Sequence, residues 1–178
     1  MPRLFTAIAL PEDVALSLSF LAGGIHGARW IDRENYHLTL RFMGDIENGA
    51  ANELAEALES VTPARFEIEL SGTGYFGGAK PRALWAGVKA ADALEQAQAR
   101  QERLCQQLGM APEQRKYTPH VTLARLRGKV SVMETDHFVA RTATFKSRPF
   151  EVQSIGLYSS RPSRGGGPYV QEHSYRLR

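Results

Sequence analysis

The chain has 178 residues, enough for one compact domain or two small fused halves and too few for a large multidomain protein. Hydrophobic residues make up 43% and charged residues 23%, which excludes a disordered chain, and no apolar run is long enough to span a membrane. The 22 basic and 19 acidic residues leave a net charge of +3 without the basic blocks of a duplex-DNA binder, so an anionic small molecule or an RNA end is the favoured partner.

The first part of the chain alternates expected strands and helices. Residues 4–10 are a short apolar run that predicts a buried strand, and a helix follows from Pro11 to about residue 23. Residues 36–43 predict a second strand, and the apolar spacing over residues 50–61 predicts a second helix. Residues 66–70 alternate apolar and polar side chains with the period of a strand.

The middle of the chain continues this pattern. The glycine- and proline-rich residues 72–81 predict a loop, and residues 83–88 predict another apolar strand. An apolar stripe over residues 91–108 predicts a longer helix that stops at Gly109. Residues 118–126 again have the composition of a strand.

The last part of the chain predicts a pair of strands. Residues 130–143 are ambiguous between strand and helix, whereas residues 150–159 and 169–177 are expected to be strands. The turn-rich residues 161–168 join them and predict either a basic arm over an RNA end or an exposed hairpin loop, of which the second is favoured.

One short motif occurs twice, about half the chain length apart. The segments His37–Phe42 and His120–Arg125 both read His, aliphatic residue, Thr, Leu, and each lies on an expected strand. This spacing predicts a duplicated half-domain in which each of two lobes contributes one strand to a shared site. Because side chains alternate along a strand, His37 and Thr39 share one face and the intervening aliphatic residue lies on the other, as in the second copy.

Two imidazoles that face each other support acid–base chemistry. Imidazole has an ordinary pKa near 6.5, so one ring of a pair can accept a proton while the other donates one. Such a pair suits in-line displacement at phosphorus, in which a base activates water and an acid protonates the departing alkoxide. The hydroxyls of Thr39 and Thr122 can donate to non-bridging phosphate oxygens.

The paired motifs resemble those of the 2H phosphoesterase superfamily, specifically its bacterial RNA 2′,3′-cyclic phosphodiesterases, also called the 2′-5′ RNA ligase family. The resemblance extends in the same order to residues 3–8, 30–44, 80–88, 117–127 and 155–159. It implies an α+β, bilobal, duplicated fold over a single domain, residues 1–178, with two antiparallel-sheet lobes, helices outside and a central cleft. It also implies that His37 protonates the leaving 3′ oxygen, that His120 activates water, and that the product is a 2′-phosphomonoester.

The resemblance assigns two further residues, each five positions after a histidine. Phe42 would stack on a base and Arg125 would contact the phosphate. Regular alternation puts both on the face opposite the histidines unless the strand twists, bulges or ends first. Arg41 is therefore an alternative phosphate partner.

The function favoured by the sequence is a metal-independent phosphodiesterase without cofactor, acting on RNA with a 2′,3′-cyclic phosphate end or on a small cyclic nucleotide. Reversible 2′-5′ RNA ligation is the same chemistry run backwards. The alternative is a non-catalytic module that binds an RNA end or nucleotide phosphate. A single cysteine, Cys105, requires no oxidising compartment, so a cytoplasmic location is expected. We also expect a monomer with no membrane partner.

Several other residues have ordinary structural interpretations. The segment Gly72–Gly77 matches G-x-G-x-x-G, but a strand rather than a helix is expected after it, so it predicts a tight loop beside the cleft and not a dinucleotide site. His26, His137 and His173 lack a threonine partner or metal-ligand spacing and are expected on the surface. Cys105 lies on an apolar helix stripe and is expected in the core.

Overall fold

The computed structural model describes residues 1–160 and 167–178. Its strands are β1 (Arg3–Ala9), β2 (Ala28–Trp30), β3 (His37–Asp45), β4 (Phe66–Ile68), β5 (Leu70–Phe76), β6 (Ala83–Val88), β7 (His120–Leu126), β8 (Phe150–Val152), β9 (Ser154–Ser160) and β10 (Tyr169–Arg176). Its helices are α1 (Glu12–Ser19), α2 (Asn48–Leu58), α3 (Asp92–Gln107) and α4 (Val132–Thr142), with single 3₁₀ turns η1 (Arg33–Asn35) and η2 (Glu59–Val61). The expected helices and strands are present, but residues 150–159, expected as one strand, form two, β8 and β9, which belong to different sheets. Strand β2 was not expected. Most of the expected 161–168 loop lies outside the described residues.

Within the described residues, eight strands form one antiparallel sheet in the order β10-β9-β1-β3-β7-β6-β5, with β2 also paired to β7. The short strands β4 and β8 form a separate antiparallel pair. A single residue pair, Leu38 with Val121, joins β3 to β7. The sheet therefore divides into a β3 lobe (β1, β3, β9, β10) and a β7 lobe (β2, β5, β6, β7).

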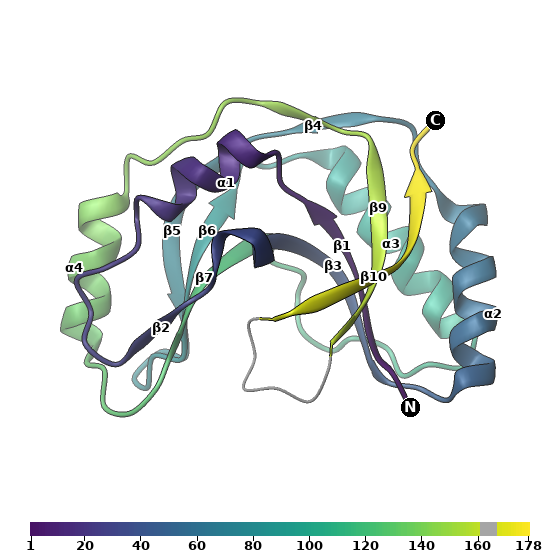
Figure 1. Cartoon of the computed structure of the whole chain (residues 1–178), viewed down its shortest axis with the longest axis horizontal. Coiled ribbons are helices and arrows are strands. Elements are labelled where there is room, and N and C mark those ends of the chain that lie inside the picture. The colour runs from purple at the N-terminus through teal and green to yellow at the C-terminus, as the bar shows by residue number, and fades with distance from the viewer. Residues whose placement is uncertain (161–166) are drawn as a thin grey trace.

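Helices cover the outside of both lobes, as expected for an α+β fold of two antiparallel lobes (Figure 1). Helices α2 and α3 lie beside the β3 lobe, on the right of the view, and α1 and α4 lie beside the β7 lobe on the left. Helix α1 therefore follows β1, a strand of the β3 lobe, but it covers the β7 lobe. None of the helices in the described ranges has the length and apolar character that a membrane span requires.

The apolar stripes of the helices form the core against the sheet. Leu54 of α2 and Cys105 of α3 are completely buried in the β3 lobe, which confirms the core position of the cysteine. Leu18 of α1 and Phe138 of α4 are buried in the β7 lobe. Each of these leucine and phenylalanine side chains contributes about 1.5–3 kcal/mol by leaving water.

The ambiguous segment 130–143 is helix α4. Its start carries a capping box in which the Ser131 hydroxyl accepts from the Glu134 N–H and the Glu134 carboxylate accepts from the Ser131 N–H. These two bonds satisfy donors that a helix otherwise leaves unpaired. The Ser-x-x-Glu spacing is a sequence signal for the start of a helix, and it would have decided between helix and strand for this segment.

The prediction of a loop over residues 72–81 is wrong for its first half, because β5 runs to Phe76. Gly74 is a strand residue: a Cβ there would lie 2.4 Å from the Trp85 ring, so glycine is needed for the ring to cross the strand. Gly72 has a φ of +70° at a register shift between Leu70 and Thr73, which is a bulge rather than a turn. Strand β6 follows β5, so the G-x-G-x-x-G match lacks the helix of a dinucleotide site.

Candidate active site

The two histidine–threonine pairs lie on the same face of the sheet, where the two lobes join. Leu38 and Val121 are directly paired and fully buried on the other face. In an antiparallel register set by that pair, His37 stands opposite Thr122, and Thr39 stands opposite His120. The half-buried side chains on this face, called here the histidine face, are those of His37, Thr39, His120 and Thr122.

Both imidazoles are held by the same kind of hydrogen bond. The Nδ1 of His37 lies 2.8 Å from the backbone oxygen of Asn35, and the Nδ1 of His120 lies 2.7 Å from that of Thr118. Because a carbonyl oxygen can only accept, each Nδ1 carries a proton. In both residues, Nε2 is therefore the atom that takes up or gives away a proton.

Aromatic side chains surround each imidazole. His37 lies 4.8 Å from the Tyr169 ring, edge to face, and 5.0 Å from the Phe5 ring. His120 lies 4.8 Å from the Phe76 ring, also edge to face, and 6.3 Å from the Trp85 ring. These distances are between ring centroids. The rings come from other strands and restrict the orientation of each histidine.

The pKa values of both histidines lie below the ordinary value of 6.5. Burial is the largest cause for His37, while the Asn35 carbonyl opposes the shift and the charges of His120 and Arg125 add to it. For His120 the cause is again burial, opposed by the Thr118 carbonyl and assisted by Arg125. Because the charge of Arg125 lowers the pKa of both histidines, Arg125 lies within electrostatic reach of both rings.

A β-bulge brings Phe42 to the histidine face. Strand β1 pairs Ala7 with Thr39 but Thr6 with Arg41, so Leu40 is an extra residue in β3. Leu40 and Arg41 are consequently both buried, and the alternation resumes with Phe42 in phase with the histidine. The Phe42 side chain is 49% exposed, so its ring is available to a ligand.

Strand β7 has a bulge at the equivalent position. Strand β6 pairs Trp85 with Thr122 but Leu84 with Ala124, which makes Leu123 the extra residue. Arg125 is therefore in phase with His120 and exposed. Phe42 and Arg125 could share a face with the histidines only if their strands departed from regular alternation. A β-bulge supplies that departure in both strands.

Arg41 points away from the histidine face, so the alternative interpretation of Arg41 as a phosphate partner is wrong. Its guanidinium is buried, with Nε 2.5 Å from the Glu102 carboxylate on α3. The two terminal nitrogens donate to the backbone oxygens of Phe42 and Ala111, each at 2.7 Å. The bulge places Arg41 on the helix side of the sheet, where all its contacts lie within the protein.

The remaining histidines have no place in this arrangement. His26, His137 and His173 are exposed, as the sequence predicts. Among residues 1–160 and 167–178, no group of three or more histidine, cysteine, aspartate or glutamate side chains could hold a metal ion.

Sequence reasoning missed the neighbours that shape the site. Phe5, Phe76, Trp85 and Tyr169 were interpreted only as parts of strands or loops. Aromatic residues in strands have a strong structural explanation, so nothing local marks these four as neighbours of a histidine. The duplicated motif was the signal for the histidines, and only strand pairing brings the aromatic rings beside them.

A two-lobed antiparallel sheet with a histidine–threonine pair on each central strand defines a class of two-histidine proteins. The model of the 2′-5′ RNA ligase superfamily matches residues 21–164, and the chain belongs to that superfamily. This confirms the resemblance seen in the motifs.

Named relatives support the same family. An RNA 2′,3′-cyclic phosphodiesterase of Aeropyrum pernix is 36% identical over 141 residues, which cover 78% of this chain and 80% of that protein. A protein of the same name from Aquifex aeolicus is 30% identical over 154 residues, covering 84% of this chain and 81% of its own. The crystal structure of E. coli LigT complexed with 3′-AMP has a TM-score of 0.81 at 23% identity and covers 99% of both chains, which shows a shared fold.

Proposed function

We propose that the protein is an RNA 2′,3′-cyclic phosphodiesterase that opens the cyclic phosphate of an RNA end or small nucleotide to a 2′-phosphomonoester. The observation that carries the proposal is the matched pair of imidazoles, each on the histidine face and each with Nδ1 bonded to a backbone carbonyl. Relatives named for this activity support it.

His37 acts as the acid and His120 as the base in this proposal. Neutral His120 takes a proton from water through Nε2 as the water oxygen bonds to phosphorus. The bond from phosphorus to the 3′ oxygen breaks, and charged His37 gives that oxygen the proton on its own Nε2. His120 ends charged and His37 neutral, and proton exchange with solvent restores the starting state.

The other residues of the histidine face bind the substrate. The Thr39 and Thr122 hydroxyls donate to the non-bridging oxygens, where negative charge develops during the displacement. The Arg125 guanidinium offers two parallel donors to the same phosphate. The exposed Phe42 ring stacks on the base.

The depressed pKa of each histidine keeps both rings largely neutral in the free protein at pH 7. An anionic phosphate between them favours the charged form and raises the pKa again. Substrate binding therefore supplies the proton that His37 donates. A bound anion also offsets the repulsion between Arg125 and a charged imidazole.

Ligation of RNA halves through a 2′-5′ bond follows from the same groups by microscopic reversibility, with a ribose hydroxyl in place of water.

Residues 1–178 act as one bilobal unit, because each lobe supplies one histidine. A cytoplasmic monomer stays a prediction, and size-exclusion chromatography with light scattering measures the monomer part.

Phosphorus NMR of a nucleoside 2′,3′-cyclic phosphate incubated with the protein and a chelator tests the proposal. The expected product is the nucleoside 2′-phosphate, formed by the wild type and not by His37→Ala or His120→Ala. A 3′-phosphate product would refute the assignment of the leaving group. If no substrate is converted even at a stoichiometric concentration of protein, the enzyme hypothesis is refuted and the alternative of a non-catalytic phosphate-binding module holds.

A further inference from the structure

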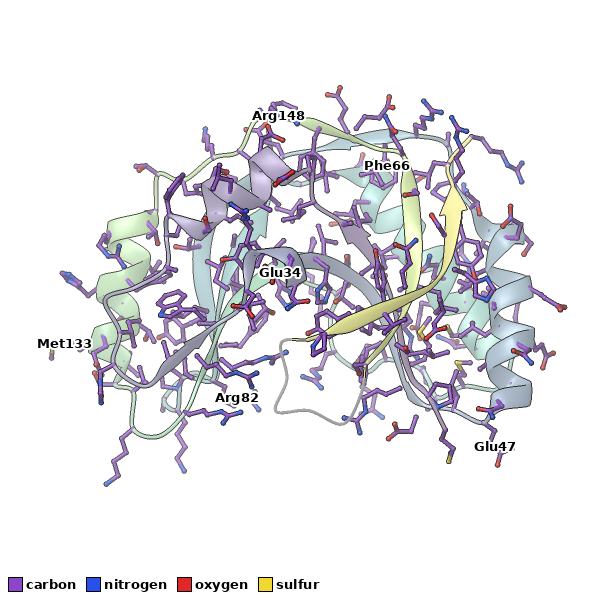
Figure 2. The ribbon with its side chains drawn as sticks, viewed as in Figure 1. Glu34, Glu47, Phe66, Arg82, Met133 and Arg148 are labelled. Atoms are coloured by element: carbon purple, nitrogen blue, oxygen red, sulfur yellow. The ribbon has the colours of Figure 1, made fainter. Side chains whose placement is uncertain are left out.

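The two lobes share very little of the sheet at the point where the histidines meet. Strand β1 pairs with β3 along its whole length, but among the described residues only Leu38 and Val121 pair β3 with β7. We call this residue pair the joint. Figure 2 labels Glu34, in the turn just before His37, at the middle of the molecule between the lobes. Other contacts must therefore fix how the two histidine strands lie relative to each other.

Tyr117 makes a direct hydrogen bond across the joint. Its hydroxyl donates to the backbone oxygen of Thr39 at 3.0 Å, so a side chain from the segment before β7 binds the backbone of β3. Thr39 is the residue of β3 that stands opposite His120. The Tyr117 side chain packs against the apolar core that contains Leu38 and Val121. Tyr117 therefore reaches the joint from the core.

The same short segment also holds the ring of His120. Tyr117 precedes His120 by only three positions, and the Thr118 backbone oxygen accepts from the His120 Nδ1 at 2.7 Å. Pro119 fixes its own φ and restricts the residue before it to extended backbone, so the segment has few conformations. A shift of Tyr117 relative to β3 is therefore passed on to the imidazole of His120.

The Tyr117 hydroxyl keeps its proton throughout the pH range in which histidines titrate. Burial raises the pKa of Tyr117 well above the ordinary value of 10, and the charge of Glu95 on α3 adds to the shift. A protonated phenol remains a donor, and the Thr39 carbonyl is an acceptor at any pH. The bond is therefore present whenever the two imidazoles exchange protons.

We propose that Tyr117 is a positioning residue, whose hydrogen bond to Thr39 sets the distance between the two imidazoles across the reacting phosphate. The inference rests on the proposed function, in which the acid and the base stand on opposite sides of one phosphorus. Both Nε2 atoms must meet the same phosphoryl group, so the angle between the strands affects the chemical step. In contrast, Phe42 and Arg125 each bind the substrate from one lobe.

Tyr117→Phe tests the proposal, because it removes the hydroxyl and keeps the ring in the core. Its kcat for a nucleoside 2′,3′-cyclic phosphate is expected to fall about fivefold, which corresponds to about 1 kcal/mol and to one neutral hydrogen bond. KM is expected to change by less than about twofold, since each lobe keeps its own contacts with the substrate. Kinetics at a temperature well below the unfolding transition exclude loss of fold as the cause.

Tyr175→Phe is the matched control. Tyr175 is buried and its hydroxyl donates to the Ala55 backbone oxygen at 2.8 Å, so this variant loses the same kind of bond. That bond joins β10 to α2, which begins next to Glu47, labelled at the lower right in Figure 2. Both variants are expected to lose similar stability in urea, but only Tyr117→Phe is expected to lose kcat. Equal kcat values in the two variants overturn the proposal.

Amide hydrogen exchange separates this proposal from hydrolysis, because it requires no turnover. The amides of residues 37–39 and 120–122 are expected to exchange about fivefold faster in Tyr117→Phe than in the wild type, and to be unchanged in Tyr175→Phe. If exchange rises while the wild type opens no substrate, the positioning role stands and the hydrolysis proposal fails. If the wild type opens the substrate and neither exchange nor kcat moves in Tyr117→Phe, only the positioning role fails. A fall in kcat without faster exchange also overturns it, because the hydroxyl would then act elsewhere than at the joint.

Discussion

Replacing Arg41 by methionine is expected to destabilise the protein strongly while leaving the catalytic step largely intact. The guanidinium has three partners: the Glu102 carboxylate at 2.5 Å and the Phe42 and Ala111 carbonyls at 2.7 Å. The side chains of Arg41 and Glu102 are only 7% and 16% exposed. Removing Arg41 leaves the Glu102 carboxylate with only the donors of its Oε1 atom, the Gln106 amide and the Glu113 N–H, and it takes the arginine donor away from Oε2 and from two carbonyls on the helix side of β3.

The magnitude follows from this burial. Breaking a buried ion pair by removing one partner costs about 3–5 kcal/mol, and the partial exposure of Glu102 favours the lower end. A loss of about 3 kcal/mol lowers the urea midpoint by about 1–2 M and the Tm by about 6–12 °C in a chain of this size. The double variant Arg41→Met/Glu102→Leu is expected to be more stable than Arg41→Met, because it buries no unpaired charge.

Urea unfolding followed by tryptophan fluorescence measures the stability, and steady-state kinetics below the unfolding transition measure the effect on the site. We expect KM to rise, because Arg41 holds the bulge that presents Phe42, and kcat to change by less than about threefold. A fall in kcat of about a hundredfold with unchanged stability would mean that Arg41 acts on the phosphate, and it would refute the position of the bulge.

Three further predictions concern the histidine face. Arg125→Met is expected to shift the pH optimum of kcat/KM to higher pH, because the positive charge of Arg125 lowers the pKa of both histidines; a shift to lower pH in the pH–rate profile would contradict this. The free energy of unfolding is expected to fall as the pH drops below 6.5, because a histidine with a depressed pKa takes up its proton more readily in the unfolded chain; His120→Asn should weaken this dependence in urea titrations at several pH values, and an unchanged dependence would count against the burial of the ring. Gly74→Ala is expected to lower the Tm by several degrees, a cost of about 1–3 kcal/mol, because the new Cβ would lie 2.4 Å from the Trp85 ring. Gly49→Ala is its control, since a Cβ there meets nothing within 4 Å, and equal losses in the two variants would rule out the ring contact as the cause.

Local patterns in the chain were sufficient for most elements and for the central histidines. Apolar periodicity located most of the strands and three of the helices, because each element buries one face and the spacing of its buried residues reflects its geometry. It missed β2 and placed most of β5 in a loop. The repeated His-x-Thr identified His37 and His120, since two copies at half-chain spacing are rare without a shared role. The same reasoning failed at Gly74, which was predicted to lie in a loop. The glycine is needed there because the Trp85 ring of the neighbouring strand lies against it.

Only the tertiary structure decided what surrounds those histidines. The order of elements along the chain does not reveal that β9 pairs with β1 and carries β10 at its other edge. It also does not reveal that α1, which follows β1 of the β3 lobe, covers the β7 lobe. The bulges at Leu40 and Leu123 depend on pairing with β1 and β6, so alternation alone could not assign Arg41, Phe42 or Arg125 to a face. Strand register is a relation between segments distant in sequence, and it is set by packing that no local pattern contains.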